Sequence, residues 1–315
     1  DPKLSASGKI SCNSCHDLET NGADKLAFSL GHDGHPVGRN SPTVFNAAGQ
    51  IAQFWDGRAL NVEEQALGPI LAAGEMAIAS LVERAPLASS LAIAFKEKGF
   101  TLALVGGPVR DALLGRLGND LDFTTSAPPL ETKKILQKWA ESVWDTGIEF
   151  GTVAGQRGET TVEVTTYRSE SYSSESRKPD VTYGTSIEGD LSRRDFTVNS
   201  MALELTGDKP VFIDPFDGLV DLAKKVLRTP GKPEDSFSDD PLRMLRAARF
   251  ASQLNFEIAP EVIIAMKDMA KRLEIISAER IRDEIIKLLM SPQPRAGITI
   301  LVETGLADIA LPEIP

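Results

Sequence analysis

Cysteine and histidine are scarce in this chain of 315 residues, and all of them lie near its start. The two cysteines and three histidines fall within residues 1–35, whereas residues 36–315 contain neither type. No run approaches the ~18 consecutive apolar residues that a membrane-spanning helix needs. The first residues show no basic-then-apolar leader, and because the chain does not begin with Met we expect a fragment at both ends. The uneven placement of cysteine and histidine divides the chain into two unlike pieces.

Positive charge is also limited, since 34 basic residues face 45 acidic ones and the formal net charge is −11. That balance excludes a protein that binds nucleic acid through an overall basic surface. It does not exclude an enzyme that contacts nucleic acid through one local patch. Hydrophobic residues make up 42% and charged residues 25%, which are ordinary globular values and exclude wholesale disorder. The length allows about two domains.

Cys12, Cys15 and His16 form a C-x-x-C-H motif in the first piece. This spacing is typical of c-type haem attachment, in which both thiols bind the haem vinyl groups and the histidine ligates the iron. A redox C-x-x-C pair is one alternative. Another is a zinc site, for which His32 and His35 could complete the usual four ligands.

The surrounding sequence is similar to the amino-terminal haem domain of bacterial dihaem cytochrome c peroxidases over about 75 residues. The similarity lies in residues 29–32, 38–43, 45–48, 53–58, 65–70 and 75–76. It implies that Cys12 and Cys15 carry the haem, that His16 is the proximal ligand and that His32 is the second axial ligand. No role follows for His35, which we expect at the surface.

The same resemblance implies a distal pocket in which Gln65 and Glu75 assist cleavage of the peroxide O–O bond. Trp55 matches the aromatic side chain between the two haems, with a core aromatic as the alternative. A second C-x-x-C-H motif is absent from the sequence, and about half of the haem domain is missing. We therefore expect a partial haem domain over residues 1–76 that does not turn over peroxide.

The second piece begins with a helical pattern over residues 81–98 and a buried strand over residues 101–105. The strand runs into Gly106 and Gly107. A glycine pair between a strand and a helix allows backbone N–H groups to approach phosphate closely. An ordinary tight turn is the alternative.

Asp120 and Asp122 follow in a second strand-like run. Residues i and i+2 of a strand point to the same face, so the two carboxylates lie side by side. Such a pair suits Mg²⁺, which binds a few oxygen ligands together with substrate phosphate. A solvated aspartate pair is the alternative. Glu163 lies in a strand-like run expected beside the aspartates, either as a third carboxylate or as an edge-strand charge.

From about residue 80 onward the chain resembles the bacterial CCA-adding tRNA nucleotidyltransferases and the related poly(A) polymerases. Its motifs are most similar to those of the actinobacterial CCA-adding type. The similarity lies in residues 106–122, 162–168, 193–202, 214–228, 239–249 and 277–289. It implies that Asp120 and Asp122 bind two catalytic Mg²⁺ ions and that the glycine turn holds the triphosphate. The other implied nucleotide-binding residues are Gly106, Gly107, Arg110, Arg194, Asp195, Asn199, Asp240, Arg243, Arg246 and Arg249.

Within that set, the resemblance implies that Asp195 and Asn199 contact the ribose and distinguish NTP from dNTP, while Arg194 contacts phosphate. Asp240 and Arg243 would read the base edge from one helical face; a salt bridge on a solvated helix is the alternative. Arg246 and Arg249 are the other two arginines of residues 239–249. They extend the stripe of polar residues on the same helical face and would reach triphosphate or primer.

The expected fold is α+β, with a nucleotidyltransferase head (80–233) on a short mixed sheet and a helical neck (234–315), preceded by a small, mainly helical c-type haem segment. The expected function is addition of CTP and ATP to a tRNA 3′ end with two Mg²⁺ ions; CC-only, A-only and poly(A) addition remain open. The alternative is a c-type haem protein. Because tRNA matures in the cytoplasm and c-type haem is attached outside it, we hypothesise a non-native join of two partial genes.

Overall fold

The computed structural model describes residues 5, 7, 9–54, 65, 69, 86–114, 116–171, 180–183, 186–208 and 210–312. The predicted roles of Trp55 and Glu75 fall on residues outside these ranges. Among the described residues, no helix combines the length and apolar character needed to cross a membrane.

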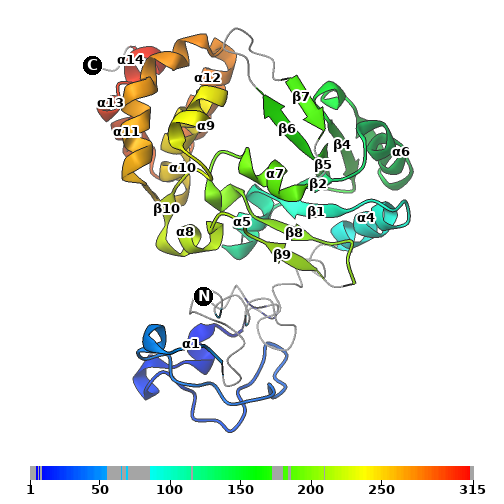
Figure 1. The fold of residues 1–315 in the computed structure, drawn as a ribbon, viewed down its shortest axis with the longest axis vertical. Coiled ribbons are helices and arrows are strands. Elements are labelled where there is room, and N and C mark those ends of the chain that lie inside the picture. Colours follow the sequence, from blue (N-terminus) through cyan, green and yellow to red (C-terminus); the bar gives the residue numbers. More distant parts are fainter. Residues whose placement is uncertain are drawn as a thin grey trace.

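The first described stretch, residues 9–54, consists mostly of turns and is drawn at the bottom of Figure 1. Its helical elements are α1 (Cys12–Cys15), η2 (Leu18–Thr20) and η3 (Ala47–Gly49). A capping box between Ser11 and Ser14 begins α1. The stretch is less helical in its described part than expected, because glycine, proline, serine and asparagine are frequent over residues 31–50 and favour turns.

A seven-stranded mixed sheet forms the centre of the second piece, in the order β3-β4-β5-β2-β1-β8-β9. Its strands are β1 (Leu102–Val105), β2 (Asp120–Thr125), β3 (Ser142–Trp144), β4 (Thr152–Arg157), β5 (Thr160–Thr166), β8 (Ala202–Glu204) and β9 (Val211–Ile213). Among the described pairs of this sheet, β2 and β5 run parallel and the others are antiparallel. Two small sheets pair β6 (Arg168–Ser171) with β7 (Asp180–Tyr183) and β10 (Val226–Leu227) with β11 (Glu257–Ile258).

Both faces of β1 are buried, and alternate residues serve different faces. Leu102 and Leu104 join the main core, together with Leu91 and Phe95 of α4. The main helices on the sheet are α4 (Pro86–Lys96), α5 (Gly107–Leu113), α6 (Pro129–Trp139) and α7 (Ile187–Ser192). Ala103 and Val105 pack on the opposite face with Leu191 of α7. This double burial explains why β1 reads as a continuous apolar run.

The described helices after the sheet form a separate group at the upper left of Figure 1. They are α9 (Pro233–Asp239), α10 (Leu242–Leu254), α11 (Pro260–Met269), α12 (Ala278–Leu289), α13 (Pro294–Glu303) and α14 (Ala307–Ala310), with η7 (Ala270–Ile275) between α11 and α12. Of the remaining elements, η5 (Ile148–Phe150) lies between β3 and β4, η6 (Thr197–Asn199) precedes β8, and α8 (Gly218–Lys224) follows β9 on the way to the neck helices. We call residues 86–233 the head and residues 234–312 the neck.

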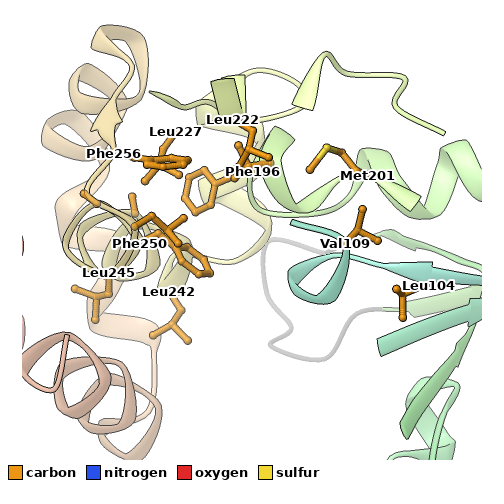
Figure 2. Close-up of a cluster of buried hydrophobic side chains, with 14 of the residues drawn as sticks. Leu104, Val109, Phe196, Met201, Leu222, Leu227, Leu242, Leu245, Phe250 and Phe256 are labelled. Carbon is orange, nitrogen blue, oxygen red and sulfur yellow. The ribbon is translucent and has the colours of Figure 1, made fainter. Parts of the chain in front are cut away.

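Helix α10 is central in the neck and packs against α9, α12 and α13. Its apolar side chains belong to one core cluster that continues into the head. Figure 2 shows this continuity, with Phe250 of α10 close to Phe196 of the head. The two rings meet edge to face, with centroids 5.9 Å apart. Head and neck therefore share a single hydrophobic core.

At Gly297, α13 lies close against α10. A Cβ at this position would lie 2.9 Å from the Ala248 carbonyl oxygen and 2.9 Å from Leu288 Cδ1. We expect Gly297→Ala to lower the free energy of unfolding by about 1–3 kcal/mol through overpacking, because the ~1 kcal/mol helix-propensity gain of alanine is smaller than this cost. Urea unfolding measures the change.

The control for this variant is Gly231→Ala, at an exposed turn where no heavy atom lies within 4 Å of the added Cβ. Its midpoint should stay near that of the parent chain. Equal midpoints for both variants would show that α10 and α13 do not depend on the close approach.

Candidate active site

Asp120 and Asp122 lie at the start of β2, where both side chains are exposed while Leu121 and Phe123 point into the core. Strand β5 runs parallel to β2, and the register places Glu163 directly beside Asp122. Glu163 is also exposed. The three carboxylates predicted from the sequence thus occupy neighbouring positions on one face of the sheet.

The charge around Asp122 favours a cation. Desolvation by the surrounding protein raises the pKa of Asp122, and the negative charges of Glu163 and Asp120 raise it further, against the lowering effect of Arg194. Within the described residues, no three His, Cys, Asp or Glu side chains form a preformed metal cage. Carboxylate oxygens in this number nevertheless fit Mg²⁺, which typically takes one or two carboxylates and completes its coordination with water and substrate phosphate.

The turn after β1 brings a guanidinium next to the carboxylates. Gly106 has φ 71° and ψ −132°, a conformation that L residues rarely adopt. Its N–H donates to the Met201 carbonyl oxygen (3.2 Å). A Cβ on Gly106 would lie 2.7 Å from Arg194 Nη1, whereas one on Gly107 would meet only Arg110 Nη2 at 3.6 Å. The missing side chain of Gly106 therefore makes room for Arg194.

Asp190, which the sequence did not single out, holds Arg194 in that place. Its side chain is fully buried and accepts from Arg193 Nη2 (2.6 Å) and Arg194 Nη2 (3.2 Å). Burial would raise the pKa of Asp190, but the charges of Arg194 and Arg193 outweigh it and keep the pKa below its usual value. The i, i+3 and i+4 spacing from Asp190 to the two arginines was the available sequence signal.

Asp195 and Asn199 lie together where the head meets the neck, and both are buried. Asp195 Oδ1 accepts from Asn199 Nδ2 (3.0 Å) and Oδ2 accepts from Arg246 Nη2 (2.5 Å). Asn199 Oδ1 accepts from Arg110 Nη1 (2.5 Å). The two residues are bridged by η6 rather than by a continuous α-helix. Arg246 therefore contacts Asp195 of the predicted ribose-binding pair.

Acid should weaken this contact between head and neck. Burial would raise the pKa of the Asp195 carboxyl, but the Arg246 charge and the hydrogen bonds from Asn199 and Arg246 hold the pKa well below its ordinary value. A depressed folded-state pKa stabilises the fold above the unfolded pKa of about 4, and this stabilisation disappears as the pH falls through the folded value. We expect Asp195→Asn to cost on the order of 2 kcal/mol at pH 7 and less at pH 3. Urea unfolding at both pH values tests this, and a gap that stays constant would contradict it.

The predicted base-reading pair is not on one helical face. Asp240 precedes α10 with extended backbone (φ −140°, ψ 98°), because the following Pro241 disfavours helical geometry there. Its carboxylate accepts from Arg280 Nη2 (2.8 Å) and from the Leu242 N–H (3.1 Å). Arg243 lies on α10, is buried, and donates to the Arg193 carbonyl oxygen (2.6 Å). Asp240 and Arg243 are thus neighbours in sequence with separate side-chain partners.

Arg249 is buried deeper in the neck. It donates from Nε to Glu284 Oε2 of α12 (2.6 Å) and from Nη1 to Gln253 (2.9 Å). Both its burial and its partners indicate that Arg249 links α10 to α12. The sequence placed it on a stripe facing the substrate because it extends the spacing of Arg243 and Arg246.

In the first piece, His16 Nδ1 lies 3.0 Å from the Pro42 carbonyl oxygen and 3.3 Å from that of Gly22. Donation from Nδ1 to these acceptors leaves Nε2 as the nitrogen able to bind a metal. Neither Cys12 nor Cys15 is in a disulfide. Within the described ranges, no three His, Cys, Asp or Glu side chains gather into a group that could hold a metal ion, so the zinc alternative with His32 and His35 gains no support there.

Three family models match the chain. One described as "Poly A polymerase head domain" matches residues 102–228, and one described as "Probable RNA and SrmB- binding site of polymerase A" matches residues 255–315. A third, "Di-haem cytochrome c peroxidase", matches residues 1–100. A CCA-adding enzyme from Levilactobacillus brevis is 43% identical over 232 residues, covering 73% of this chain. Residues 80–315 resemble the head and neck of the bacterial CCA-adding enzymes and related poly(A) polymerases.

Other CCA-adding relatives and solved structures agree. The Enterococcus faecalis enzyme is 43% identical over 208 residues, which is 66% of this chain and 50% of its own length. The Bacillus stearothermophilus CCA-adding enzyme in complex with CTP has a TM-score of 0.63 and 37% identity, over 72% of this chain and 53% of that one. A tRNA nucleotidyltransferase complexed with a primer tRNA and an incoming ATP analogue has a TM-score of 0.59 and 31% identity, over 70% and 62%. The present chain spans 57% of the Levilactobacillus enzyme and about half of the Enterococcus one.

Proposed function

We propose that the chain is a tRNA 3′-end nucleotidyltransferase that adds C and A residues from CTP and ATP and releases pyrophosphate. The observation that carries the proposal is the placement of Asp120, Asp122 and Glu163 beside the Gly106 turn and Arg194. This arrangement combines oxygen ligands for Mg²⁺ with a cation for phosphate. Similarity to enzymes solved with CTP and with primer tRNA supports the same substrates.

Asp120 and Asp122 would hold the metal ions, with Glu163 adding negative charge beside them. When bound, Mg²⁺ lowers the pKa of the primer 3′-hydroxyl and neutralises charge on the transferring phosphate. Arg194, oriented by Asp190, would bind the triphosphate at the glycine turn. These groups position the primer and the NTP rather than react covalently with them.

Asp195 and Asn199 would both contact the ribose, with Asp195 accepting a hydrogen bond from the 2′-hydroxyl. These contacts would give the preference for NTP over dNTP. Asp240 and Arg243 are proposed to offer an acceptor and donors to the base. For that role Arg243 would turn part of its guanidinium from the Arg193 carbonyl toward the nucleotide. Arg246 would orient Asp195, and Arg249 would hold α10 against α12.

We propose a head from about residue 80 to 233 and a neck from 234 to 315, acting in the cytoplasm. Packing of α4 supports a head that includes this helix, since Leu91 and Phe95 are completely buried and Trp139 Nε1 donates to Ser90 Oγ (2.8 Å). The match to the haem-domain model extends to residue 100 and so overlaps this helix.

The experiment is incorporation of labelled nucleotide into tRNA that lacks its 3′ CCA. The purified chain is mixed with Mg²⁺ and with CTP, ATP, or both. Addition of C residues followed by A is expected, and ordered products distinguish CCA addition from CC-only, A-only and poly(A) addition. Absence of incorporation with every NTP would refute the proposed activity of this chain.

A c-type haem in residues 1–76 is the second candidate, as a remnant of a dihaem peroxidase. It is favoured only for that segment, by the Nδ1 contacts of His16 and by the family-model match. Cys12 and Cys15 would attach the haem, with His16 and His32 as ligands and Gln65 and Glu75 near the distal side. Expression with haem-attachment machinery should give a Soret band and a covalent haem mass, and their absence would dismiss this candidate.

A further inference from the structure

Three guanidinium groups surround the ring of Phe250 at the border of head and neck. The central guanidinium carbon of Arg249 lies 3.9 Å from the ring centroid, that of Arg110 lies 5.2 Å away and that of Arg246 lies 5.4 Å away. The ring is 5% exposed. Cation–ring attraction is stronger where water is excluded, so the ring attracts all three cations.

Two of these arginines donate hydrogen bonds to the polar pair Asp195 and Asn199. Arg246 donates to Asp195 from Nε (2.8 Å) and Nη2 (2.5 Å), and Arg110 donates to Asn199 from Nη1 (2.5 Å). The attraction between the ring and a guanidinium uses none of the hydrogen-bond donors of that guanidinium. Each guanidinium can therefore face the ring and still present its donors to the pair.

A third contact reaches the same pair through the backbone. The ring of Phe196 meets Phe250 edge to face at 87°, and the Phe196 N–H donates to Asp195 Oδ1 (2.8 Å). Figure 2 shows Phe250 and Phe196 near each other, and places Phe256 in the same cluster. Three separate contacts of one neck side chain thus converge on Asp195 and Asn199 in the head.

Guanidinium groups held this close together repel one another. Asp195 and Glu284 supply opposite charges to Arg246 and Arg249, and Asp111 does so for Arg110 (2.9 Å). An aliphatic side chain in place of the ring would fill the core but give no attraction to the cations. The arginines would then be free to shift away from the pair.

We propose that Phe250 is a positioning residue that sets the ribose selectivity of the site by fixing the orientation of Asp195 and Asn199 through Arg246 and Arg110. This inference rests on the proposed function, in which that pair contacts the 2′-hydroxyl. The neck thereby takes part in distinguishing CTP from dCTP although Phe250 does not touch the nucleotide.

The test is calorimetric binding of CTP and of dCTP, with Mg²⁺ present, to the full chain and to Phe250→Leu. We expect the preference for CTP over dCTP to fall about fivefold to tenfold, the size of one or two guanidinium–ring contacts. Most of the loss should be in CTP affinity. If Phe250 served only core packing, its replacement would weaken the binding of CTP and dCTP equally and leave the ratio of the two affinities unchanged.

Phe256→Leu is the matched control, because Phe256 belongs to the same core, is 7% exposed and, within the part of the chain that the structure describes, has no guanidinium over its ring. It should keep the parent ratio. Phe250→Met, a more flexible replacement, serves if the leucine variant does not fold. If the parent chain prefers CTP and a folded Phe250 variant has the same ratio of CTP to dCTP affinity, the positioning role of Phe250 is wrong while the proposed function stands. Failure of the parent to bind CTP overturns the proposed function and this inference together.

Discussion

Replacing Asp120 with asparagine is expected to reduce nucleotide incorporation at least ~10³-fold, because the two-metal site supplies several kcal/mol of transition-state stabilisation. The substitution keeps the size of the side chain but removes its charge. Because Asp120 is exposed at the start of β2, the fold should not be affected. Asp122→Asn should behave in the same way. The measurement is the single-turnover rate of incorporation into tRNA lacking CCA.

Asp145→Asn is the control for loss of one exposed head carboxylate. Asp145 pairs with Lys133 (2.6 Å), outside the group formed by β2 and β5. Its variant should retain the parent rate. If Asp120→Asn also retains it, the assignment of the metal ligands to β2 is wrong.

Gly106→Ala is expected to lower activity about 10- to 100-fold by displacing Arg194. The added Cβ would lie 2.7 Å from Arg194 Nη1, so the guanidinium must move away from the turn. Loss of one charged contact to phosphate is worth about 1.5–3 kcal/mol, which gives this range. The positive φ adds a stability cost on the order of 1–3 kcal/mol.

Gly99→Ala separates these two effects. Gly99 has a similar φ of 78°, but no heavy atom lies within 4 Å of its added Cβ. The control should lose comparable stability in urea while keeping the incorporation rate. Equal activity in the two alanine variants would show that Arg194 does not act at this turn.

The local elements of the site followed from sequence patterns. The strand before Gly106 is a continuous apolar run, and the start of the Asp120–Asp122 strand alternates polar and apolar residues. The placement of Glu163 beside the two aspartates is confirmed by the parallel pairing of β2 with β5. These features depend on short-range periodicity, which a sequence records directly. The continuous core of head and neck depends on contacts between distant residues and was not predicted.

Positions near helix ends were harder to predict. Asp240 was expected on a helix, but Pro241 keeps it outside α10 and its carboxylate instead meets Arg280, which is 40 residues away. Asp190 was overlooked because its burial becomes visible only when α7 packs on the sheet. Phe250 was not singled out, since nothing in its neighbourhood along the chain indicates the approach of Arg110 from the head.

The shared core also limits how this part of the chain can be exchanged between proteins. Phe196 and Phe250 pack against each other although 54 positions separate them (250 minus 196). A recombination point between Phe196 and Phe250 would build one core from two parental sequences. The core side chains from the two sequences would then have to fit each other. A point upstream of residue 86 divides none of the packing among the described residues of that core. The region in which the family resemblance changes is therefore also the region where recombination leaves the inherited head and neck core undivided.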